Sequence, residues 1–245
     1  WAIAAGNPDD ETPRWSPPRR LANGVMMNKP VVAPDGRWLA PVALWKTDGS
    51  ARVLASDDDG ASWDRIGQAN VLHREDRNCD EHMIVVRRDG SLWMLVRTRY
   101  GIGESVSSDG GRTWSEVRPS ALAHPASRFF IRRLASGNLL LVKHGPLAER
   151  TGRSHLTAYL SSDDGRTWRG GLLLDERDKV SYPDGVQAPD GTIHIIYDWS
   201  RLRDKHILLA SFAEEDIEAG TPRPHRARLK TLVNQATGQR PPPSE

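Results

Sequence analysis

Ser56-Asp57-Asp58-Asp59-Gly60-Ala61-Ser62-Trp63 is the stretch that decides the fold, because its pattern Ser-x-Asp-x-Gly-x-x-Trp returns twice. The second copy runs from Ser107 to Trp114 and the third from Ser161 to Trp168. A short Asp side chain can accept hydrogen bonds from nearby backbone N–H groups, and Gly tolerates a positive φ. The Trp ring can fold back over the turn and become buried between strands. Each copy, called a box below, is therefore expected to shape a hairpin and to carry no chemistry.

The spacing of the boxes predicts a repeated unit. The second box starts 51 residues after the first, and the third starts 54 residues after the second. A period near 50 residues suits one four-stranded blade of a β-propeller. Asp-Gly turns between apolar runs mark hairpins inside the repeats. Blades are therefore expected near residues 25–72, 73–122, 123–178 and 179–213.

The ends of the chain are expected to differ from the blades. Residues 1–24 are predicted to be a remnant of a further blade, residues 214–218 a short helical turn, and residues 220–245 a loose tail after a propeller domain over 1–219. Six blades of this size need roughly 300 residues or more. The 245 residues are thus expected to form about four blades and a remnant of an all-β, six-bladed propeller whose N-terminal part lies outside this chain.

The amino-acid composition of the chain limits the kinds of molecule that it is expected to bind. The 34 basic and 32 acidic residues are spread along the chain, which argues against nucleic-acid binding. No apolar run approaches the roughly 20 residues of a membrane-spanning helix. The single Cys79 excludes an internal disulfide, and no motif for a metal or another cofactor is present, so none is expected. No signal peptide is visible, and localisation is left open, with a secreted or periplasmic protein among the alternatives.

Polar side chains recur where each innermost strand of a propeller would begin, facing the central channel. A channel is polar and wet in any propeller, so a structural role is one interpretation of these residues. The other is a binding or catalytic site at the channel mouth. The candidates are Asn28, Lys29, Glu81, His82, Arg128, Tyr182 and Asp184.

Four polar residues have a spacing that resembles the sialidase (neuraminidase) superfamily of propellers with BNR or Asp-box repeats. Glu81 comes shortly before an Asp-Gly turn, and Arg97 ends the strand after that turn. Arg153 lies eight residues before the third box, and Tyr182 lies eight residues before the last Asp-Gly pair. The resemblance covers most of residues 25–215.

The resemblance implies an exo-acting glycoside hydrolase that cleaves terminal sialic acid from a glycan with retention. Tyr182 would be the nucleophile and Glu81 its base, because a neutral Tyr is not repelled by the sugar carboxylate. Arg97 and Arg153 would bind that carboxylate through charge-assisted hydrogen bonds. His82, Arg128, Asp184, Asn28 and Lys29 are further candidate site residues.

The sequence also departs from the sialidase pattern. The family's first Arg and its Asp acid/base have no counterpart, since both would lie ahead of Trp1, and Tyr182 is followed by Pro-Asp. Because these two residues are absent, this chain taken alone is a candidate for a hydrolase fold without hydrolase activity. Two alternatives stay open. One is a lyase or hydrolase directed at uronic-acid polysaccharides that uses His82, Tyr182 and Arg97. The other is a glycan-binding propeller without activity.

Overall fold

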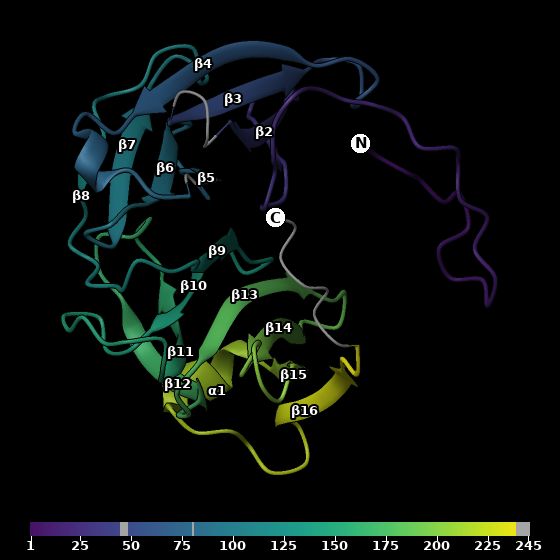
Figure 1. Cartoon of the computed structure of the whole chain (residues 1–245), viewed down its shortest axis with the longest axis vertical. Helices are drawn as coiled ribbons and strands as arrows, with labels where there is room; N and C mark the ends of the chain where they lie inside the picture. Colours follow the sequence, from purple (N-terminus) through teal and green to yellow (C-terminus); the bar gives the residue numbers. More distant parts are fainter. Residues whose placement is uncertain (45–48, 80, 239–245) are drawn as a thin grey trace, which may run out of the picture.

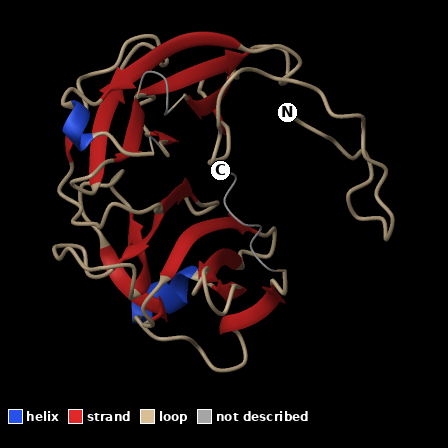
Figure 2. Cartoon of the chain, in the orientation of Figure 1, coloured by secondary structure: helices blue, strands red, loops and turns tan. Residues whose placement is uncertain are grey.

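The computed structural model describes residues 1–44, 49–79 and 81–238, and these form an all-β propeller with four blades. Each blade is a four-stranded antiparallel sheet whose strands follow one another in chain order. The blades follow one another in an arc, coloured from blue to yellow along the chain (Figure 1). Strands dominate the architecture and helices are few and short (Figure 2). The four repeats expected from the box spacing are thus confirmed as four blades.

The strand bounds place each blade within its predicted repeat, except at the C-terminal end. The first blade contains β1 Val31–Val32, β2 Trp38–Ala43, β3 Ser50–Ser56 and β4 Asp64–Asn70. The second contains β5 Met83–Val86, β6 Leu92–Arg97, β7 Ile102–Ser107 and β8 Arg118–Pro119. The third contains β9 Phe130–Arg133, β10 Leu139–His144, β11 Leu156–Ser161 and β12 Arg169–Asp175. The fourth contains β13 Val180–Gln187, β14 Ile193–Trp199, β15 His206–Phe212 and β16 Arg228–Gln235.

The predicted loose tail over residues 220–245 is wrong for residues 228–235, and its last seven residues, 239–245, lie outside the described residues. Strand β16 pairs antiparallel with β15 and forms the outer edge of the fourth blade. Nearly all of its residues are exposed, and only Leu229 packs against the core among the described residues, so the sequence gives little sign of a strand here. The helix predicted nearby is confirmed as α1, Glu214–Ala219, and a 3₁₀ turn covers Arg74–Asp76.

The central strands of the second and third blades are largely buried on both faces. Every residue of β6, β10 and β11 is buried, because these two blades each pack between two neighbours. A short apolar run of this kind is the pattern of a fully buried strand. The first strands lie at the centre of the arc, where β1 contacts β5, β5 contacts β9, and β9 contacts β13. Residues at the start of these strands therefore share one end of the central channel.

The boxes join the third and fourth strands of their blades, as their structural role predicts. In the second box, Asp109 accepts hydrogen bonds from the Thr113 backbone N–H at 2.9 Å and the Thr113 hydroxyl at 2.6 Å. The Ser107 hydroxyl also donates to Asp109, at 2.9 Å. These bonds hold the pKa of the Asp109 carboxyl well below its usual range. The Trp114 ring donates from Nε1 to the Gly111 carbonyl at 2.9 Å, but it is only half-buried, less than its predicted burial between strands.

The N-terminal remnant pairs with itself through isolated bridges, Ala2 with Arg19 and Ala5 with Trp15. Arg19 fixes it to the first box by donating to the carbonyl oxygens of Gly60 and Ala61. Among the described residues, no helix is long and apolar enough to cross a membrane.

Candidate functional site

The pairing of β5 with β6 brings Glu81 and Arg97 to one edge of the second blade. Met83 at the start of β5 lies opposite Leu95 near the end of β6. Continuing that antiparallel register by two residues sets Glu81 across from Arg97. The Arg97 Nη1 donates to Glu81 Oε2 at 2.8 Å, and the side chains are only 6% and 1% exposed. A buried pair of this kind needs the hydrogen bond to offset the loss of hydration.

Tyr182 reaches this pair from the fourth blade because of an irregularity in β13. Ser181 lies opposite Asp198 and Asp184 opposite Ile196, so two residues of β13 face one of β14. This is the geometry of a β-bulge, which redirects a side chain. Tyr182 itself adopts a φ of 55°, in the left-handed region that non-glycine residues rarely use. Backbone strain of this kind persists only where the surroundings enforce it.

The three side chains meet at one point. The Tyr182 hydroxyl donates to Glu81 Oε1 at 3.1 Å, and Arg97 Nη1 lies 3.4 Å from the same hydroxyl oxygen. Burial alone would lower the pKa of Arg97, but the hydrogen bond and charge of Glu81 outweigh it, so the pKa is raised. Arg97 therefore stays protonated beside Glu81. The arrangement can accept the phenolic proton and stabilise the oxygen that has lost it.

The two predicted carboxylate-binding arginines differ in their partners. Arg97 uses its second terminal nitrogen, Nη2, to donate to the carbonyl oxygen of Ala126 at 3.0 Å, so both terminal nitrogens have protein acceptors. Arg153 is half-buried, and its Nη1 donates only to the Ser181 hydroxyl, at 3.2 Å. Burial, followed by repulsion from Arg97 and then Arg201, lowers the pKa of Arg153. Arg153 is thus the one with capacity for an anionic ligand.

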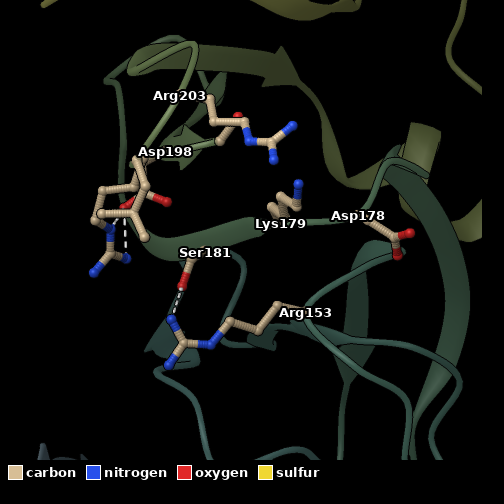
Figure 3. A pocket seen from close by; sticks show the side chains of 9 residues that line it. Arg153, Asp178, Lys179, Ser181, Asp198 and Arg203 are labelled. Atoms are coloured by element: carbon tan, nitrogen blue, oxygen red, sulfur yellow. Dashed lines mark hydrogen bonds and ion pairs between the residues drawn. The ribbon is translucent and has the colours of Figure 1, made fainter.

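Arg153 lines a cavity of about 620 Å³ between the third and fourth blades (Figure 3). The wall includes Ser181 from β13 and Asp198 from β14. It is completed by the turn that joins β14 to β15 and by the residues ahead of β13, namely Asp178, Lys179, Ser200, Arg201, Leu202 and Arg203.

Arg201 and Asp198 border Tyr182 and were not singled out by sequence reasoning. The Arg201 guanidinium lies over the Tyr182 ring, 4.3 Å from its centroid, and pairs with Asp198 Oδ2 at 2.8 Å. Asp198 Oδ1 is buried and has no hydrogen-bond partner among the described residues. Burial raises the pKa of Asp198, against the opposing charges of Arg201 and Arg153. No sequence motif marks either residue, and it is the register of β13 with β14 in the structure that sets Asp198 opposite Ser181.

Four of the further candidates form a second polar cluster. Arg128 donates from Nη2 to Asn28 Oδ1 at 2.7 Å and lies 3.6 Å from Asp184 Oδ2. Lys29 Nζ lies 2.5 Å from Asp184 Oδ1. These contacts tie the segment ahead of β1 to the third and fourth blades. The four residues are brought together as mutual partners across the channel.

The His82 side chain is hydrogen-bonded to the first blade. Its side chain is buried, and Nε2 lies 2.7 Å from the carbonyl oxygen of Arg52 in the first blade, where it acts as a donor. Its own carbonyl oxygen accepts a hydrogen bond from Asn28. Within the described ranges, no group of three or more His, Cys, Asp or Glu side chains is placed to hold a metal ion.

Comparison with known proteins agrees with this architecture. The chain matches the family described as BNR repeat-like domain over residues 4–195. It is 30% identical over 177 residues to a sialidase from Micromonospora viridifaciens, which is 66% of this chain and 26% of that protein. The chain therefore spans about a quarter of the length of this curated relative.

Two solved structures share the fold. A Hadza microbial sialidase superposes with a TM-score of 0.57 and 22% identity, covering 77% of this chain and 37% of that one. An ulvan lyase, described as a new polysaccharide lyase family, superposes with a TM-score of 0.55 and 13% identity, covering 89% and 61%. At these identities the likeness shows the fold alone. With its boxes, its four blades and the match over most of its length, the chain belongs to the BNR repeat-like domain family and is a distant homologue of sialidases.

Proposed function

We propose that this propeller belongs to an exo-acting glycoside hydrolase that removes terminal sialic acid from glycans with retention of configuration. The observation that carries the proposal is the hydrogen bond from the Tyr182 hydroxyl to Glu81 Oε1 at 3.1 Å. The distance lies within the range that a general base needs. Arg97 holds the other carboxylate oxygen of Glu81 and so fixes its orientation.

In the first step, the Tyr182 oxygen forms a bond to the anomeric carbon while its proton moves to Glu81 Oε1. The bond from that carbon to the aglycone oxygen breaks, and the aglycone oxygen takes a proton from an acid. Arg97 Nη1, 3.4 Å from the phenolic oxygen, stabilises the negative charge that develops there. Water then attacks the same carbon and gives a proton to the conjugate base of that acid, while the bond to Tyr182 breaks and Glu81 returns its proton to the Tyr182 oxygen. Two displacements at one carbon give net retention.

A Tyr nucleophile suits a sugar with a carboxylate on the reacting carbon, because a carboxylate nucleophile would be repelled. We assign the sugar carboxylate to Arg153, which faces the cavity and keeps free donors. Arg97 acts on Glu81 and Tyr182 instead, since its terminal nitrogens already have acceptors in the protein. The resemblance assigned carboxylate binding to both arginines, whereas this proposal keeps that role for Arg153 alone.

Two other functions remain to be separated from this one by experiment. A uronate-directed lyase or hydrolase would use the same Tyr182 and Arg97, and the ulvan lyase shows that the fold is used by a lyase. The third function is glycan binding without turnover. The Tyr182–Glu81 contact favours chemistry over binding alone, because the phenol is only half-buried and its partner is a carboxylate that can take its proton.

The test is a screen of the full-length protein with aryl sialosides and aryl uronides. Release of the aryl group from the sialoside, with the α-anomer of sialic acid as the first product by NMR, supports the proposal. Release from the uronide alone, or an unsaturated sugar that absorbs in the ultraviolet, overturns it in favour of the second function. Binding of both without turnover favours the third.

A further inference from the structure

The cavity beside Tyr182 carries more positive charge than the proposed chemistry uses. Six charged side chains line it, four basic and two acidic. Arg201 and Asp198 pair with one another, and Arg153 is assigned to the sugar carboxylate. Lys179, Arg203 and Asp178 are left over, and these three lie on the exposed part of the wall.

Lys179 and Arg203 are unpaired cations on the same side of the cavity. Among the described residues, neither side chain has a hydrogen bond or an ion pair. The Lys179 amino group and the Arg203 guanidinium point toward one another in Figure 3, whereas the Asp178 carboxylate points away from both. Two like charges on the same side of one cavity repel each other when they approach, and an anion bound between them turns that repulsion into attraction. The arrangement is therefore suited to an anionic group.

The backbone next to the two cations is strained and hydrogen-bonded across the cavity wall. Lys179 has a φ of 68° and Ser200 a φ of 51°, both in the left-handed region. The Ser200 N–H donates to the Lys179 carbonyl at 3.1 Å, and the Arg203 N–H donates to the Ser200 carbonyl at 2.9 Å. Strained backbone at non-glycine positions concentrates at functional sites. Two residues of the cavity wall, Lys179 and Ser200, therefore have strained backbone, and Tyr182 next to Ser181 of the wall is a third such position.

We propose that Lys179 and Arg203 form a second anion subsite, which binds a sulfate or carboxylate group on the sugar next to the one that is cleaved. As a statement about the cleaved glycan, this rests on the proposed function. The substrate class is then an oligosaccharide with at least two anionic groups. Arg153 holds the first group near Tyr182, and the Lys179–Arg203 pair holds the second at the outer part of the same cavity.

The first experiment uses inorganic sulfate and does not depend on turnover. Sulfate is titrated at low ionic strength by calorimetry into the parent protein, the double variant Lys179→Gln/Arg203→Gln, and the control Arg14→Gln/Arg166→Gln. The control removes the same charge from exposed sites away from the cavity. We expect the cavity variant to lose at least about tenfold in affinity, as for one charge-assisted hydrogen bond, and the control to keep the parent's affinity. No sulfate binding to the parent, or equal losses in both variants, overturns the subsite.

The second experiment compares two sialyl oligosaccharides that differ by one sulfate on the sugar next to sialic acid, with a third that carries a uronate there. Affinities are measured in a Tyr182→Phe background. The anionic neighbour should tighten binding about tenfold, and the cavity variant should abolish that gain. Equal affinity for all three glycans contradicts the inference. If sulfate binds as expected but no sialoside binds or is cleaved, the proposed function fails and the subsite stands.

Discussion

The substitution Tyr182→Phe isolates one oxygen atom of the candidate site. It removes the hydroxyl that donates to Glu81 Oε1 and keeps the ring beneath Arg201. Under the proposed mechanism it deletes the nucleophile, so kcat for an aryl sialoside should fall by at least about 10²-fold, the lower bound for a lost proton-transfer group. Initial rates with an aryl sialoside measure this loss.

The effect of Tyr182→Phe on folding should be small, because Glu81 keeps its second partner. Arg97 still donates to Glu81 Oε2 at 2.8 Å, so the buried carboxylate is not left as an unpaired charge. One hydrogen bond to a charged acceptor is lost, at a cost of about 1.5–3 kcal/mol. For a chain of this length that lowers Tm by roughly 3–12 °C. Activity and stability should therefore separate clearly in this variant.

A matched control lies in the same blade. The Tyr197 hydroxyl donates to Asp175 Oδ2 at 3.1 Å, and Arg177 also donates to Asp175, so the trio repeats the Tyr–carboxylate–Arg arrangement. Tyr197 is 1% exposed and its pKa is raised by burial, then by Asp175. Tyr197→Phe should cost similar stability and leave kcat near the parent value. Equal loss of activity in the two variants, or none in Tyr182→Phe, would refute the assignment of the nucleophile.

Three further predictions follow from the geometry. Arg153→Gln should lower kcat/KM for a sialoside by about 10- to 100-fold through loss of a charge-assisted contact, and an unchanged KM would contradict its role. Trp114→Ala should cost about 1–3 kcal/mol in urea unfolding, less than a fully buried Trp, because the ring is half-buried. Burial lowers the pKa of His144 to about 4 from 6.5, so the unfolded state takes up the proton first and stability falls as pH drops from about 6.5 to 4. Urea midpoints across that range should fall less steeply in His144→Asn than in the parent.

The fold could be predicted from sequence because its signals are local. Each box fixes a turn through bonds that span two to four residues, such as Ser161 to Asp163 and Thr167 to Asp163. A local pattern that recurs at a constant interval gives the blade length directly. Tyr182, Glu81 and Arg97 were also within reach, since Glu81 and Tyr182 each precede an Asp-Gly turn by eight residues and Arg97 ends the strand after the first of these turns. The bonds among the three agree with that prediction of proximity.

The remaining features could not be predicted because they arise from contacts between distant segments. Arg201 is one arginine among many, and only the β14–β15 turn brings it over the Tyr182 ring. The partners of Arg97 depend on where the Ala126 carbonyl falls in the chain between two blades. Strand β16 carries no periodic apolar pattern, because its position at the edge of the sheet demands none.

The hydrogen bond between Tyr182 and Glu81 joins residues 101 positions apart. During synthesis the second blade can close long before Tyr182 leaves the ribosome, so the box turns and hairpins form while the site does not yet exist. Contacts that enclose so long a loop form late, since the entropy of closing the loop is lost before the contact is gained. During refolding, the strands should therefore form first, as measured by circular dichroism. Activity should appear later, when the fourth blade docks and completes the site.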